Sequence, residues 1–241
     1  MDYASLVAFV EGGLGNLSVR EGPMASKERV EQSIAIHLGK DPGNIDNGIW
    51  REIPSALISA VTTKLRYESA RVAKRWNQYS NEETITGSLF SQIDDEFVVG
   101  PWTAKFDFVE FSKHGKESKT GADLAMILDA RDATGRRGVK TIWFQAKSHE
   151  ELPTDWRSLQ NLERQMSIMR TFTSEAFGLV YTRHGVHVVG EEIASPGYTL
   201  SDFVQRAVEC QFGDARLAIF AQSLNRMQIF EVLLDERVKT S

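Results

Sequence analysis

Three polar side chains stand near the ends of two apolar segments, where their chemistry could be combined. Asp123 lies at the start of the segment GADLAMILDA, and Gln145 and Lys147 lie at the end of the segment VKTIWFQAK. Side chains alternate between the two faces of a strand, so Gln145 and Lys147 would share one face and the apolar residues between and before them would take the core side. If the two segments pair as a hairpin, a carboxylate, an amide and an ammonium converge at one place.

This combination suits the cleavage of a phosphodiester. Carboxylate and amide oxygens are ligands for a hard divalent cation such as Mg²⁺. Such a cation activates water and neutralises the charge that builds on the phosphate. The lysine amine can orient or deprotonate the attacking water, and it can pair with the phosphate. The three residues therefore predict a metal-dependent phosphodiesterase site.

The elements that must position these residues follow from the periodicity of the chain. The two segments read as strands, and the turn-rich stretch RDATGRRG between them is typical of a hairpin. Further strands are expected at 105–111, 177–182 and 186–189. Helical patterns cover 26–38, 54–76, 81–93 with Asn81 as N-cap, 155–172, and 200–210 with Ser201 as cap. The last segments, 216–220 and 228–234, are ambiguous between strand and helix. The order predicts an α/β domain built around one central sheet.

Composition and charge exclude several classes of protein. The net charge of −5 argues against a generic nucleic-acid coat, although phosphate attraction is local and an acidic body can carry a basic groove. No apolar run is long enough to span a bilayer, and the N-terminus lacks the basic region of a signal peptide. A single cysteine, Cys210, excludes an intrachain disulfide and a thiolate metal cluster, so we expect a cytoplasmic protein.

With these residues the chain resembles the PD-(D/E)XK nuclease superfamily. GAD matches the acid near the start of one strand, and QAK matches the acid-x-Lys of the neighbouring strand in its Gln variant. NEETITG looks like the helix that often contributes a metal-proximal Glu, and LERQMSIM looks like the Gln-bearing helix after the Lys strand. The pattern, from about Glu82 to Gly185, is similar to a bacterial group of small nuclease-like proteins suspected in defence against phage. The resemblance implies a restriction-endonuclease-like α/β fold, a central mixed β-sheet flanked by helices, with a helical N-terminal region.

The resemblance also implies a role for each matching residue. Asp123, Gln145 and Glu83 would hold Mg²⁺ or Mn²⁺, and Lys147 would be the catalytic amine. Glu82 competes with Glu83 for the place on the helix, and the sequence leaves that choice open. The substrate would be nucleic acid, DNA rather than RNA. Candidate substrate-binding residues are Gln165 on the later helix and Arg136 and Arg137 in the hairpin loop.

The organisation of the chain is predicted as a nuclease-like core over 51–190, an N-terminal extension over 1–50 and a C-terminal α/β extension over 191–241. No membrane partner is expected. We expect a homo-oligomer or a partner in a defence complex. Because Gln replaces the second acid, an inactive nucleic-acid-binding or complex-subunit module of the same fold is the alternative to an enzyme. An unrelated α/β protein is a third reading. His184 and His187 lack a third metal ligand nearby, so we interpret them as surface or cross-strand residues.

Overall fold

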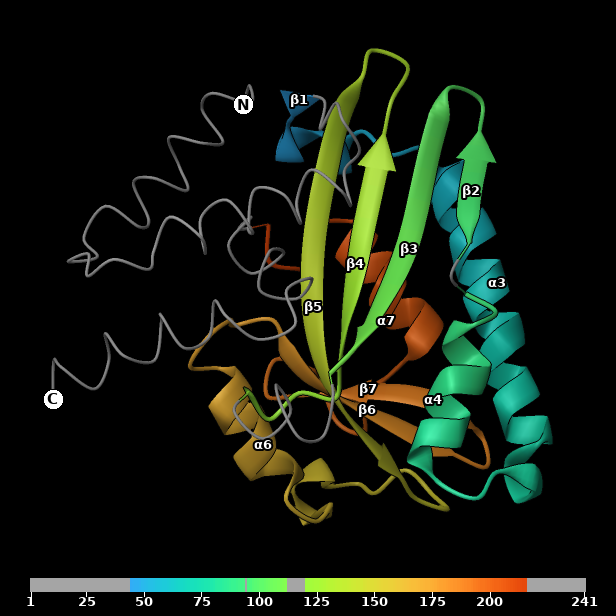
Figure 1. Ribbon diagram of the computed structural model, residues 1–241, viewed down its shortest axis with the longest axis vertical. Helices are drawn as coiled ribbons and strands as arrows, with labels where there is room; N and C mark the ends of the chain where they lie inside the picture. The colour runs from blue at the N-terminus through green and yellow to red at the C-terminus, as the bar shows by residue number, and fades with distance from the viewer. Residues whose placement is uncertain (1–43, 94, 112–119, 216–241) are drawn as a thin grey trace, which may run out of the picture.

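A computed structural model of the chain describes residues 44–93, 95–111 and 120–215 (Figure 1). The helix expected over 26–38 and the ambiguous segments after residue 215 lie outside these ranges. Within them the structure is an α/β fold, and no described helix is long and apolar enough to cross a membrane.

The strands form one mixed sheet in the order β2-β3-β4-β5-β6-β7-β8, with the short β1 paired to β5. Pairing is antiparallel along this order except between β5 and β6, which run parallel. The predicted hairpin is confirmed, since β4 and β5 pair with Leu124 opposite Phe144. The bounds are β1 Asn44–Ile45, β2 Glu96–Val99, β3 Trp102–Glu110, β4 Leu124–Arg131, β5 Arg136–Ser148, β6 Ala176–Thr182, β7 Gly185–Val189 and β8 Tyr198–Thr199.

Helices cover both faces of this sheet. Those described are α3 Ser55–Lys74, α4 Glu82–Phe90, α6 Leu162–Met169 and α7 Leu200–Val208, with short 3-10 helices η1 Asn47–Arg51, η2 Trp76–Gln78 and η3 Trp156–Ser158. Figure 1 shows α7 behind β3 and β4, α3 and α4 at the right, and α6 at the lower left. The larger apolar core holds residues of α3, α4 and α7, and a second core holds residues of α6 and η3. The sheet is therefore the middle layer of three.

Side-chain caps begin two of the described α-helices, and one of these caps is the residue predicted. Asn81 Oδ1 accepts a hydrogen bond from the backbone N–H of Thr84 at 2.9 Å, as predicted for an N-cap. The cap of α7 is Thr199, whose hydroxyl accepts from the N–H of Asp202, so the prediction of Ser201 is wrong by two residues. The helix predicted over 155–172 is broken into η3 and α6, because Asn161 adopts a left-handed conformation with φ 62°.

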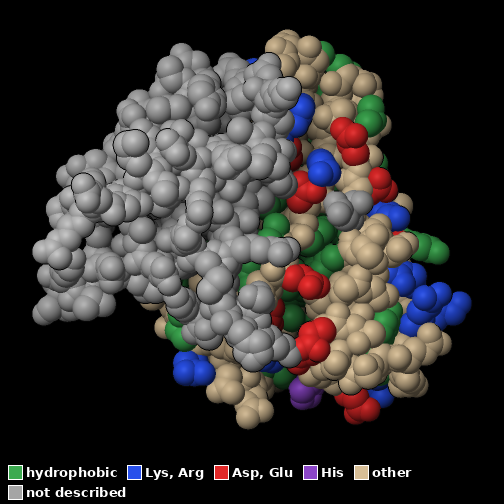
Figure 2. All heavy atoms as spheres, in the orientation of Figure 1, with side chains coloured by type: hydrophobic (Ala, Val, Ile, Leu, Met, Phe, Trp, Pro, Cys, Tyr) green, Lys and Arg blue, Asp and Glu red, His purple; other side chains and the backbone are tan. Residues whose placement is uncertain are grey.

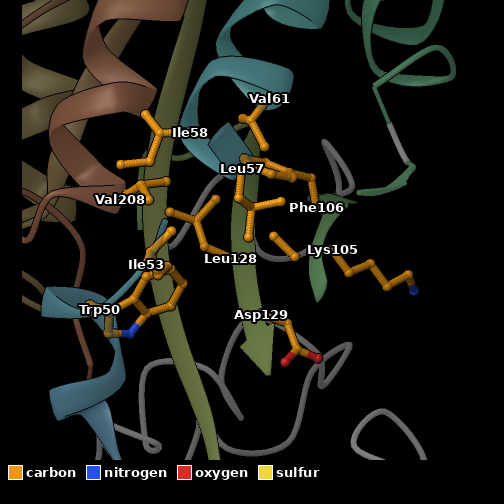
Figure 3. Close-up of a pocket in the computed structure, with 11 residues that line it drawn as sticks. Trp50, Ile53, Leu57, Ile58, Val61, Lys105, Phe106, Leu128, Asp129 and Val208 are labelled. Carbon is orange, nitrogen blue, oxygen red and sulfur yellow. The ribbon is translucent and has the colours of Figure 1, made fainter. Parts of the chain in front are cut away.

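A small cavity lies between α3 and the sheet. Figure 3 shows Leu57, Val61 and Phe106 around it, with the charged ends of Lys105 and Asp129 directed away. Its volume is about 10 Å³, which is room for one water molecule at most. We therefore interpret it as a packing gap.

Candidate functional site

The site is built where β5 extends past the start of β4. Asp123, directly before β4, donates its backbone N–H to the carbonyl of Phe144 at 2.8 Å, where the pairing of the two strands ends. The next N–H on this edge of β5 belongs to Ala146, and it is bonded by the Asp123 carboxylate at 2.7 Å. The Asp123 carboxylate thus accepts the hydrogen bond that a longer β4 would have accepted. A one-residue change in the length of β4 would remove this arrangement.

Gln145 lies against the same carboxylate. Its side-chain Nε2 donates to Asp123 Oδ2 and lies 3.3 Å from the carbonyl oxygen of Ala146. The side chain belongs to the face of β5 that carries Trp143, which α6 covers, and it is only 2% exposed. Two oxygens from different parts of the chain therefore converge on one nitrogen. The Ala146 carbonyl can reach this point because the N–H and C=O of one strand residue point to the same edge.

Glu82 is the acid that the first turn of α4 brings to the end of β5. Its Oε1 accepts a hydrogen bond from the backbone N–H of Ser148 at 3.0 Å. Ser148 is two residues past Ala146, so its N–H lies on the same edge of the strand. Glu83, next along the helix, is exposed. Of the two acids that the sequence leaves open, the structure gives Glu82 a contact with the strand that carries Lys147.

A chain of buried hydroxyl groups holds Glu82 in place. The Thr86 hydroxyl donates to the carbonyl of Glu82 at 2.8 Å, so the hydroxyl of Tyr181, also 2.8 Å from Thr86 Oγ1, must be the donor to it. Tyr181 is fully buried on β6 beside Ser148. These bonds connect the first turn of α4 to the centre of the sheet, and they fix the helix that carries the acid.

The electrostatics of Tyr181 show which carboxylates surround this point. Burial raises the pKa of the Tyr181 phenol far above its usual range, while its hydrogen bond to Thr86 acts in the opposite direction. The nearby carboxylates of Asp123, Glu82 and Glu110 raise the pKa further. Tyr181 therefore stays protonated and keeps the hydrogen that it donates to Thr86. Glu110, at the end of β3, is a third acid near the site that the sequence did not single out.

Lys147 lies on the side of the sheet expected for it. It alternates with Ala146, which belongs to the larger core, and so shares the face of Gln145. The side chain is partly exposed, and its residue is paired with Val180 of β6. Lys147 therefore lies at the end of the strand where Asp123 and Gln145 meet, as a partly exposed residue.

Gln165 lies on α6, the helix that covers this face. The residue is partly buried, and its backbone carbonyl presses against Gly121, two residues before Asp123. A Cβ at Gly121 would lie 2.6 Å from that carbonyl oxygen, and Gly121 has a φ of +72°, so both space and conformation require glycine here. Gly121 thereby lets α6 approach the segment that presents Asp123.

The structure does not bring Arg136 and Arg137 to this site. Both are at the start of β5, whereas Gln145 and Lys147 are at its end, about 30 Å away at ~3.3 Å per residue. Arg137 is 1% exposed and its Nε donates to Asp129 at 2.8 Å. Arg136 forms ion pairs with Glu52 and Asp132 at 2.6 and 2.7 Å. These arginines stabilise the end of the hairpin that lies away from the site.

Among the described residues, His184 and His187 are not part of this site. His184 Nε2 lies 2.9 Å from a carboxylate oxygen of Glu151 on the surface. His187 on β7 is partly buried, and burial lowers its pKa, with His184 adding to the effect. Residues 44–93, 95–111 and 120–215 hold no group of three or more His, Cys, Asp or Glu side chains arranged around a metal. The donors that meet are of mixed kind: the Asp123 carboxylate, the Ala146 carbonyl and the Gln145 amide, with the Glu82 carboxylate at the next N–H along the strand edge.

One of these donors was missed from the sequence, and so were the two hydroxyl groups that hold Glu82. A backbone carbonyl such as that of Ala146 cannot be recognised from residue type. It could have been inferred from the alternation of carbonyl directions along a strand that extends past its partner. Tyr181 and Thr86 could not have been paired, because 95 residues separate them. Figure 2 shows Asp and Glu side chains (red) at the surface beside α4 and the lower strand ends, and Lys and Arg side chains (blue) over α3 at the right edge.

Comparison with known proteins adds no relative to this picture. No protein-family model matches the chain, and no curated protein matches it.

Proposed function

We propose that this protein is a metal-dependent endonuclease of restriction-endonuclease-like fold that hydrolyses DNA phosphodiester bonds with Mg²⁺ or Mn²⁺. One observation carries the proposal: the Asp123 carboxylate and the Ala146 carbonyl converge on the Gln145 amino group. The Asp123 and Ala146 oxygens both lie near one positively polarised group, and a cation could take the place of that group. Hard oxygen donors of this kind are those that Mg²⁺ prefers.

The residues that would hold the cation come from three elements. Asp123 would supply a carboxylate oxygen, Ala146 its carbonyl and Gln145 its amide oxygen, and Glu82 would complete the set from α4. Once bound, the cation would lower the pKa of a water molecule and neutralise charge on the phosphate. Glu82 takes the role that the sequence had divided between two neighbouring acids, because its carboxylate already contacts the end of β5.

Lys147 would act on the substrate side of this point. Its ammonium shares a face with Gln145 and reaches solvent, so it can pair with a phosphate oxygen and hold the attacking water in line with the scissile bond. As an amine, it can also accept a proton from that water when deprotonated. Substituting Lys147 by Met would keep the length of the side chain and remove both abilities.

Nicking of a supercoiled plasmid tests the proposal. The purified full-length protein should convert supercoiled to open-circular or linear DNA with Mg²⁺ or Mn²⁺ and not with EDTA. Asp123→Asn and Lys147→Met should each lower the rate by at least about 100-fold. Arg136→Gln, far along β5, is the matched control and should cut normally. Undiminished nicking by Asp123→Asn would refute the assignment.

A second function is favoured by one specific contact. Gln145 donates to Asp123, so the carboxylate has a hydrogen-bond partner without a cation. A non-cleaving nucleic-acid-binding module, alone or as a subunit of a defence complex, would keep such a closed pair. Salt-sensitive DNA binding with no nicking in either metal would establish this function in place of the nuclease.

A further inference from the structure

Two buried amide oxygens near this site accept no hydrogen bond from the described residues. They are Gln145 Oε1 on β5 and Gln165 Oε1 on α6. A buried acceptor without a donor is costly, and native proteins contain few of them. Two in one neighbourhood call for a common physical explanation.

The two side chains belong to facing elements. Gln145 projects from the face of β5 that α6 covers, since Trp143 on that face shares a core with Leu162 and Met166 of α6. Gln165 precedes Met166, and its backbone lies against Gly121, next to the segment that leads to Asp123. The orphaned oxygens therefore come from the strand and the helix that enclose one side of the Asp123 site.

The amide of Gln145 has a donor end and an acceptor end, and only the donor end is used. Its Nε2 is directed at Asp123 Oδ2 and the Ala146 carbonyl. A turn of about 180° about the last side-chain bond exchanges the two ends without moving the backbone, because this torsion is close to two-fold. The oxygen would then face Asp123 and Ala146, and the NH₂ group would face α6.

We propose that Gln145 is a two-position switch on the cation site and that Gln165 is its latch. Without a cation, the Gln145 NH₂ group closes the site. With a cation, the amide turns, its oxygen joins Asp123 and Ala146 as a ligand, and its NH₂ group donates to Gln165 Oε1. Both orphaned oxygens gain a partner in the second position. The inference rests on the proposed function, because it assigns the regulation of that same cation site.

The switch gives a physical role to glutamine at this position. A glutamate could not donate to Asp123, so it would leave two carboxylates repelling each other in the empty site and would bind a cation more tightly. Glutamine removes that repulsion, and a cation must displace a hydrogen bond to enter. The site would therefore fill only above a threshold cation concentration, and Gln165 would set that threshold by stabilising the turned amide.

Cation binding to the full-length protein tests this, with Mn²⁺ followed by electron paramagnetic resonance and Mg²⁺ by calorimetry. Gln165→Met keeps the length of the side chain and removes the acceptor, so it should raise the Kd about fivefold, the effect of one neutral hydrogen bond. Gln160→Met, an exposed glutamine just before the same helix, is the matched control and should leave the Kd unchanged. In the cation-free protein, Gln165→Met should unfold at the same temperature as wild type or higher.

A second background separates the latch from a general effect of the helix. Gln145→Glu should bind the cation more tightly than wild type, and adding Gln165→Met to it should change nothing, because a carboxylate at 145 has no NH₂ group to donate. The side-chain ¹H–¹⁵N signals of Gln145 should also shift when cation is added to wild type, and shift less in Gln165→Met.

Three results would overturn the inference. If wild type binds the cation, Asp123→Asn does not, and Gln165→Met matches wild type, the latch is wrong and the cation site stands. If Gln165→Met weakens binding equally in the Gln145→Glu background, its effect does not pass through the amide. If wild type binds neither Mg²⁺ nor Mn²⁺, the inference and the proposed nuclease fail together.

Discussion

Exchanging Glu82 for Gln is the sharpest perturbation of the candidate site, because the next residue supplies its own control. Both Glu82 and Glu83 lie in the first turn of α4, where acids favour the helix dipole equally. Glu82 differs by its contact with the N–H of Ser148, and a glutamine oxygen can still accept that bond. Glu82→Gln therefore removes a charge and leaves the packing and the cap of α4 in place.

The expected loss follows from the position of the charge. A divalent cation and a carboxylate about 4 Å apart attract by about 2 kcal/mol at the dielectric constant of water and by about 8 kcal/mol at an effective value near 20. Glu82 is partly exposed, so we expect the lower end, about 2–3 kcal/mol. This corresponds to a Kd for Mn²⁺ about 30- to 150-fold higher. Glu83→Gln, at an exposed residue, should change the Kd by less than about threefold.

Calorimetric titration of Mn²⁺ into the three proteins, with plasmid nicking beside it, would decide the matter. The unfolding temperatures should agree within about 2 °C, since no buried group is lost. The reverse pattern, with Glu83→Gln weakened and Glu82→Gln normal, would refute the assignment that we draw from the Ser148 contact. Equal losses in both would show that only the net charge of the helix end matters.

Three further predictions concern the surroundings of the site. Tyr181→Phe removes the donor to Thr86 and should lower the free energy of unfolding by about 1 kcal/mol in urea titrations; an unchanged value would show that the hydroxyl chain contributes nothing. Arg137→Met should cost about 3–5 kcal/mol by the same measurement, because it leaves Asp129 buried without its main partner, and it should not alter DNA binding by the folded protein. Because the pKa of His187 is lowered in the folded protein, the unfolded chain takes up a proton first as the pH falls. The neutral imidazole therefore contributes its full share of the folding stability above about pH 6.5, and that share is lost as the pH falls. His187→Gln should flatten the decline in stability between pH 7 and 5, and an unchanged slope would contradict the role of burial.

The sequence predicted the elements of the sheet better than it predicted their contacts. The hairpin of β4 and β5 is confirmed because alternating apolar residues and turn chemistry are local signals. The α/β class with a mixed sheet flanked by helices is confirmed for the same reason. The break at Asn161 was missed, since an asparagine inside an apolar stripe gives little sign of a left-handed residue.

The site was predicted only where side-chain type carries the signal. Asp123 and Gln145 do meet, which pairing of their segments required. To choose between Glu82 and Glu83, one must know how α4 is rotated about its own axis. The bond between Thr86 of this helix and Tyr181, far along the chain, holds that rotation. The sequence could not predict the placement of Arg136 and Arg137 either. An arginine that forms an ion pair within the protein and one that contacts a ligand stand in the same pattern of residues.

In the part of the chain that the structure describes, β4 does not reach the end of β5, and two carboxylates cap successive N–H groups there. An uncovered strand edge invites a second chain to add to the sheet, and inward charges are a common defence against such association. Asp123 and Glu82 occupy two adjacent docking points for a foreign strand. Alanine at both positions would open that edge, so a doubly substituted protein made to abolish cleavage should dimerise or aggregate, whereas the Asn and Gln versions should stay dispersed.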